Sequence, residues 1–121
     1  MSIKSKRAVA VYFDGACPVC TREMAVYQRA EGAESVDFVD VARCGPAALG
    51  PSLSTEAALA RLHVRLTDGR LVSGAAAFAA LWLSLPRWAW AGRIASLPVI
   101  LPALELAYRG FLKLRRLWRR A

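Results

Sequence analysis

Several features are scarce or absent in this 121-residue sequence, and each one narrows the classes of protein to which it can belong. Only three cysteines are present, and the basic N-terminus is not followed by the hydrophobic segment of a secretory signal. We therefore expect a reducing compartment, the cytoplasm, and no disulfide scaffold. No charge-free run reaches the roughly 18 residues of a membrane-spanning helix. Internal repeats and disordered tracts are also lacking, so residues 1–121 are expected to form a single domain.

Acidic residues are scarce in the last third of the chain. Residues 1–86 contain nine Lys/Arg and eight Asp/Glu, whereas residues 87–121 contain eight Lys/Arg and one Asp/Glu. Apolar residues in the latter segment follow helical spacing from Ala103 to about Arg119. We expect a basic helical C-terminal extension, residues 87–121, packed on the domain with a solvated face. The alternative is peripheral contact of this basic helix with an anionic membrane or an acidic partner. No nucleic-acid-binding module accompanies it, so no nucleic acid is predicted as a partner.

The first 86 residues alternate between strand and helix patterns. Strands are predicted at residues 8–13, 36–40, 63–67 and 71–73, and helices at residues 20–30, 55–61 and 75–85. Asp68-Gly69 is a strong hairpin signal, and Ser54 or Thr55 provides a cap for the second helix. The stretch from Trp88 to Pro102 is punctuated by proline. A βαβ unit followed by a ββα unit is the arrangement of thioredoxin-like α/β domains, which are built around a small mixed sheet.

A Cys-x-x-Cys pair follows the first predicted strand directly. Pro18 suits the first turn of a helix, so Cys17 and Cys20 are expected at the positive end of a helix dipole. This position favours the thiolate that thiol–disulfide exchange requires. Cys17 is the predicted nucleophile, and Cys20, one turn further on the same side, is the predicted resolving thiol. The hypothesis requires that one sulfur be easily ionised and reachable from solvent.

Two other side chains are candidates for a role beside the pair. Asp14 can accept a proton from the resolving thiol, or it can cap the free N–H groups of the loop. His63, the only histidine, can polarise the pair if it faces it, or it is a packed, hydrogen-bonded core residue. Cys17, Cys20, Cys44 and His63 have the composition of a zinc site, but a second close-spaced pair is lacking. Neither a metal nor another cofactor is therefore predicted. The alternatives to an oxidoreductase are a metal- or cluster-holding module and a redox-sensitive adaptor at a membrane surface.

The segment of residues 14–20 resembles the Asp-x-x-Cys-x-x-Cys signature of the DCC family of predicted thiol–disulfide oxidoreductases. The resemblance continues in Leu62-His63-Val64, Asp68-Gly69-Arg70, Gly74-x-x-Ala77-Phe78 and Leu81-Trp82. It implies a thioredoxin-like fold and a protein or small-molecule disulfide or thiol as substrate. The Cys-Pro-x-Cys order also resembles glutaredoxins, but His63 stands about where those proteins carry a proline.

Overall fold

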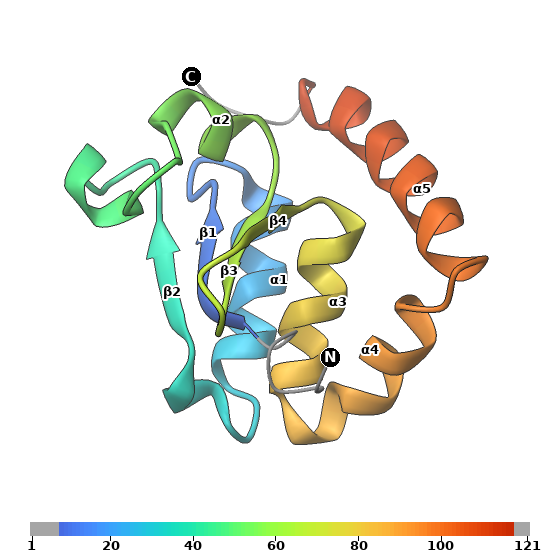
Figure 1. The fold of residues 1–121 in the computed structure, drawn as a ribbon. Helices are drawn as coiled ribbons and strands as arrows, with labels where there is room; N and C mark the ends of the chain where they lie inside the picture. Colours follow the sequence, from blue (N-terminus) through green and yellow to red (C-terminus); the bar gives the residue numbers. More distant parts are fainter. Residues whose placement is uncertain (1–7, 118–121) are drawn as a thin grey trace.

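The protein is built on a four-stranded mixed sheet, shown in Figure 1, and the computed structural model describes residues 8–117. The strand order is β2-β1-β3-β4. The strands are β1 (Ala8–Phe13), β2 (Asp37–Asp40), β3 (His63–Leu66) and β4 (Leu71–Ser73). β1 pairs with β2 in parallel and with β3 in antiparallel orientation, and β3 and β4 form a hairpin. This α/β topology confirms the predicted thioredoxin-like fold class.

Helices connect and flank the strands. They are α1 (Pro18–Gln28), α2 (Thr55–Ala60), α3 (Ala75–Ser84), α4 (Ala89–Ala95) and α5 (Ile100–Arg115). Three short 3-10 turns are η2 (Ala33–Ser35), η3 (Pro46–Leu49) and η4 (Pro86–Trp88). The predicted cap of α2 is confirmed, because the hydroxyl of Ser54 accepts a hydrogen bond from the N–H of Ala57 at 3.1 Å. A local sequence signal, Ser54, therefore sets where α2 begins.

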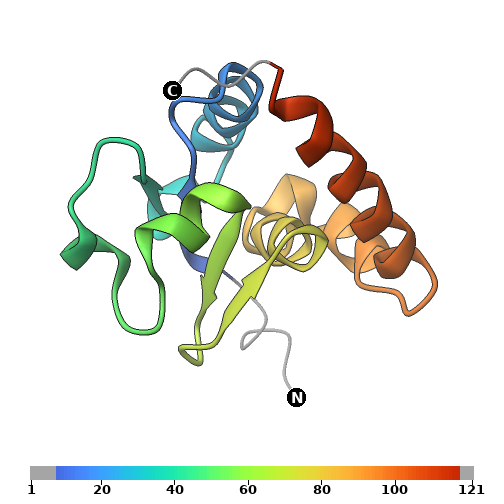
Figure 2. The same ribbon diagram turned by 90° about the horizontal axis from the view of Figure 1, so that it is seen from above.

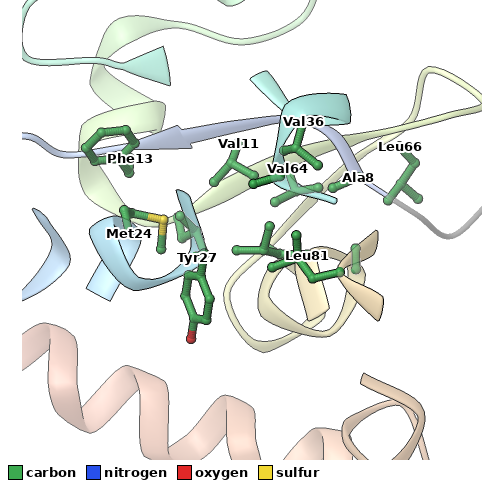
Figure 3. Packing of buried hydrophobic residues seen from close by; sticks show 14 residues of the cluster. Ala8, Val11, Phe13, Met24, Tyr27, Val36, Val64, Leu66 and Leu81 are labelled. Carbon is green, nitrogen blue, oxygen red and sulfur yellow. The ribbon is translucent and has the colours of Figure 1, made fainter. Parts of the chain in front are cut away.

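From Val11 to Phe13, strand β1 is buried on both faces of the sheet. Val11 and Phe13 point to one face, where they pack with residues of α1 and α3 in the main core, as Figure 3 shows. Tyr12 points to the opposite face and packs in a second cluster with Leu49 and Ala58. Successive side chains of a strand alternate between faces, so a strand with two covered faces is apolar throughout. This position explains the continuous apolar run that precedes the Cys pair.

The C-terminal part differs from the sequence-based prediction. The proline-punctuated stretch contains helix α4, and α5 begins at Ile100 rather than Ala103. Pro102 is compatible with this earlier start, because a proline in the first helical turn sacrifices no hydrogen bond. α4 and α5 contact α3 and lie on its side away from β2, as Figures 1 and 2 show. The predicted helix end near Arg119 lies outside the described residues.

Candidate functional site

The loop between β1 and α1 is fixed by the carboxylate of Asp14, which is only 3% exposed. Its Oδ1 accepts a hydrogen bond from the N–H of Ala16 at 2.9 Å, and its carbonyl accepts one from the N–H of Cys17 at 3.1 Å. The bond that the capping hypothesis predicts for Asp14 is therefore present. Oδ2 of the same carboxylate lies 3.9 Å from Nη1 of Arg115.

Asp40, at the end of β2, holds this loop from the other side. Its Oδ1 accepts hydrogen bonds from the N–H groups of Gly15 and Ala42, both at 3.1 Å. A Cβ atom at position 15 would overlap the Asp40 carboxylate, so a glycine is needed there. The sequence analysis predicted the strand around Asp40 as part of a βαβ unit, but no local signal marks the Asp40 carboxylate as the partner of Gly15.

Cys17 is the N-cap residue of α1 and has an extended backbone. Its Sγ accepts a hydrogen bond from the N–H of Cys20 at 3.3 Å, and Pro18 occupies the first turn. None of the surface of Cys17 is exposed, whereas Cys20 keeps partial exposure. The hypothesis asked for one sulfur that is both easily ionised and reachable from solvent. Cys17, the predicted nucleophile, has no exposed surface, and the partly exposed residue of the pair is Cys20. The two cysteines are not both buried in the core, and they lie on the same side of the N-terminus of α1.

The environment of Cys20 disfavours its ionised form. Burial, followed by the hydrogen bond and the charge of Cys17, raises the pKa of Cys20 to about 12. Arg115 acts in the opposite direction through a hydrogen bond and its positive charge. Cys20 is therefore a protonated thiol at neutral pH, and its conversion to an attacking thiolate depends on nearby groups that oppose these effects.

Arg115 is a second residue of this site that the sequence analysis missed, after Asp40. It is 8% exposed, although it belongs to the basic segment whose charged face was expected to be solvated. Nη2 donates to the carbonyl oxygens of Leu59 at 2.8 Å and Ala60 at 3.1 Å, and Nη1 lies 3.9 Å from Sγ of Cys20. The sequence did contain a signal that could have identified Arg115. Its helical spacing places it on the same side of the helix as Tyr108 and Phe111, and not beside the exposed basic residues.

A small cavity of about 20 Å³ lies beside Cys20, between α1, α3 and α5. Its lining includes Asp14, Cys20, Phe78, Tyr108 and Phe111. A cavity of this size has room for about one water molecule where polar groups are available. Asp14 and the Cys20 thiol thus border a common space in which a proton can be relayed.

The remaining candidate residues are not gathered with the pair. Nδ1 of His63 donates to the carbonyl oxygen of Arg61 at 2.9 Å, which fits the hydrogen-bonded core interpretation. Sγ of Cys44 lies 3.9 Å from the carbonyl oxygen of Val41, and Cys44 packs against the second cluster. Within residues 8–117 no group of three His, Cys, Asp or Glu side chains is placed to hold a metal ion. The four potential zinc ligands are therefore not brought together.

Comparison with known proteins supplies one match. A family model described as DCC1-like thiol-disulfide oxidoreductase matches residues 11–121, from β1 through the Cys pair and α5. Comparisons with curated proteins and with solved structures find no match to this chain. Because the family match covers nearly the whole sequence and includes every residue of the site, the chain belongs to the DCC1-like thiol-disulfide oxidoreductase family.

Proposed function

We propose that this protein catalyses thiol–disulfide exchange with Cys17 as the nucleophile and Cys20 as the resolving thiol. The main support for this proposal is the geometry of the pair. Cys17 caps α1, and the backbone N–H of Cys20, one turn further, donates a hydrogen bond to the Cys17 sulfur at 3.3 Å. Hydrogen bonds at a helix N-terminus favour a sulfur anion. The family match supports chemistry of this class.

In the first step the Cys17 thiolate attacks a substrate disulfide. A bond forms between Cys17 and one substrate sulfur, and the other substrate sulfur leaves as a thiolate that takes a proton from solvent. Since Cys17 has no exposed surface, the contacts that cover it must part when substrate enters.

In the second step Cys20 loses its proton and attacks the Cys17 sulfur of the mixed disulfide. The Cys17–Cys20 bond forms, the bond to substrate breaks, and the second substrate thiolate leaves. Two electrons have then passed from the protein to the substrate. Asp14 borders the same cavity as Cys20 and is the proposed proton acceptor, through a single water molecule. His63 is assigned no step, because its Nδ1 is engaged with Arg61.

A trapping experiment tests the order of the two cysteines. The Cys20→Ser variant should accumulate a stable mixed disulfide with 5,5′-dithiobis(2-nitrobenzoate), detectable by mass spectrometry, whereas Cys17→Ser should not. Cys44→Ser is the matched control and should turn over like the wild type. The proposal is wrong if Cys17→Ser reduces protein disulfides as fast as the wild type. A stable adduct in Cys17→Ser alone would reverse the order of the two thiols.

A second candidate function is suggested by the outer surface of the C-terminal helices: adaptor-like docking at an anionic membrane. Ten large hydrophobic residues are notably exposed in the described part of the chain, and seven lie in residues 90–117. These are Trp90, Ile94, Leu97, Val99, Leu106, Leu114 and Leu117. Exposed Arg109, Lys113 and Arg116 run beside the leucines at helical spacing. Apolar residues flanked by basic ones are typical of helices that bind in the plane of a lipid surface.

By length and composition, no single helix within residues 8–117 qualifies as a membrane span; Pro86–Ala95 and Ile100–Arg115 pass only as a pair bent by 98°. Peripheral contact is therefore the form of membrane binding that we propose, and cytoplasmic location stays a prediction from the sequence. Sedimentation with phosphatidylcholine/phosphatidylglycerol vesicles should show binding that high salt weakens. Leu106→Glu should abolish binding, whereas Val26→Glu, at a similarly exposed apolar site on α1, should preserve it. Absence of binding at low salt would remove this candidate.

A further inference from the structure

Arg115 is a buried cation at the Cys pair, and it does not belong to the basic surface around it. Its exposure is 8%, while its neighbours Lys113 and Arg116 on the same helix are exposed. Burying a guanidinium is costly unless its N–H groups are satisfied. Backbone carbonyls and a carboxylate satisfy the guanidinium of Arg115, so its buried position is specifically stabilised.

The two terminal nitrogens of the Arg115 guanidinium have different partners. Nη2 donates to the carbonyl oxygens of Leu59 and Ala60 at the end of α2. Nη1 lies 3.9 Å from Sγ of Cys20 and 3.9 Å from Oδ2 of Asp14. The carbonyls fix the side chain without neutralising it, and the other edge presents positive charge to the sulfur.

The backbone that carries Arg115 is held by a series of polar contacts. The carboxylate of Glu105 bonds with Arg61 and with the N–H of Ala75. The hydroxyl of Tyr108 accepts from the N–H of Leu62 at 2.7 Å. With Arg115 these contacts join α5 to the α2–β3 junction along most of its length, which sets the register of the helix. A cation 95 residues away in the sequence is thereby delivered to Cys20.

We propose that Arg115 is the positioning residue that makes Cys20 an effective attacking thiol. The inference rests on the proposed function and concerns its second step, in which the Cys20 thiolate forms the bond to Cys17 and expels the substrate thiolate. A guanidinium beside a thiol stabilises its anion. In the reverse direction Cys20 is the leaving sulfur, and the same charge helps it to leave. Arg115 therefore serves both directions of electron transfer.

Removing the charge of Arg115 should slow the second step only moderately, because two effects on the Cys20 thiolate oppose each other. Without Arg115 a smaller fraction of Cys20 is ionised, and the Asp14 carboxylate is no longer balanced. The thiolate that remains is more nucleophilic, which offsets roughly half of the loss on a logarithmic scale. We expect the second step to slow about three- to tenfold in Arg115→Gln, which displaces its pH–rate curve by about 0.5–1 pH unit to higher pH.

Single-turnover reaction with 5,5′-dithiobis(2-nitrobenzoate) separates the steps, because each one releases a coloured thiolate. In Arg115→Gln the rate of the first phase should stay within about twofold of the wild type, and the second phase should be about three- to tenfold slower. Arg115→Lys keeps the charge and should restore the second phase to within about threefold of the wild type. Arg29→Gln removes a positive charge from an exposed site and should leave both phases unchanged. Circular dichroism checks the fold of each variant, and Arg115→Met replaces Arg115→Gln if the latter is not native.

The proposal is overturned if folded Arg115→Gln or Arg115→Met resolves the adduct at the wild-type rate at every pH. It is also overturned if both phases slow equally without displacement along the pH axis, since a purely structural role predicts that result. Alkylation of Cys20 by iodoacetamide in a Cys17→Ala/Cys44→Ala background provides a test that needs no turnover. If the wild type forms no mixed disulfide, the proposed function fails, yet an Arg115-dependent alkylation profile would still support the assignment of Arg115.

Discussion

Helices α1 and α5 both reach the Cys pair, but they are held in place by different forces. α1 buries Met24 and Tyr27 in the main core, against the sheet and α3. α5, over Ile100–Arg115, fully buries Arg115 alone; hydrogen bonds and ion pairs join it to the α2–β3 junction, and Tyr108 also packs against the main core beside Phe78. One helix supplies the sulfurs and is fixed by apolar packing. The other supplies the charge and is fixed by polar bonds together with the packing of one aromatic side chain, Tyr108.

This difference implies that the two helices differ in how readily they detach. Apolar burial in the core contributes to the global stability, so α1 is lost only when the sheet unfolds. Polar contacts at a partly exposed interface exchange with water at a small net cost. α5 is therefore expected to open first. Opening of α5 would withdraw Arg115 from Cys20 while the Cys pair itself remains formed.

The largest expected effect comes from weakening the packing that holds α1. Leu81 of α3 has no exposed surface and belongs to the main core. Leu81→Ala should lower the free energy of unfolding by about 2–5 kcal/mol, measured by urea denaturation, with both helices lost in one transition. Val26→Ala, at a site 51% exposed on α1, should change it by no more than about 0.5 kcal/mol. A loss below about 1 kcal/mol in Leu81→Ala would contradict the role given to apolar packing.

A smaller and more local effect is expected at the polar contacts of α5. Glu105→Gln removes the charge that pairs with Arg61 and Arg109 and should destabilise the docked helix by about 1–2 kcal/mol. Amide hydrogen exchange should accelerate in α5 and stay unchanged in β1 and β3. Glu31→Gln, which changes an exposed carboxylate in the turn after α1, is the control. Equal loss of protection in α5 and the sheet would show that the two parts unfold as one unit.

The same contrast explains what could be predicted from the sequence. The bounds of β1, the hairpin of β3 and β4, and the cap at Ser54 follow from rules that operate over a few residues. The position of Cys17 and Cys20 at a strand–helix junction follows from the same rules. These features lie in the sheet and the helices packed on it, where the apolar residues that predict each element are also the residues that form the core.

The features that were missed depend on contacts between distant segments. Asp40 meets Gly15 only because β2 lies parallel to β1, and Arg115 meets Cys20 only when α5 is docked. The charge count of residues 87–121 did not single out Arg115, although it lies two helical turns after Tyr108 on the same side of the helix. α4 was overlooked because prolines flank it and the segment between them is short. The register of α5 is set by polar partners that no local pattern reveals.

The smallest expected effect is the acid response of the α5 contacts. Burial alone would raise the pKa of Glu105, but the hydrogen bonds from Arg61, Ala75 and Arg109 outweigh it and lower this pKa. A carboxyl group with a lowered pKa stabilises the folded state above its unfolded pKa of about 4.3, and this stability is lost as the pH falls through the folded value. The difference in unfolding free energy between wild type and Glu105→Gln should therefore be constant near neutrality and shrink below about pH 4.3. Asp68, whose pKa is lowered at the hairpin tip chiefly by the N–H of Arg70, provides the matched comparison. Asp68→Asn should leave amide exchange in α5 unchanged at every pH, so a shared acid response would show that α5 is not controlled by its own contacts.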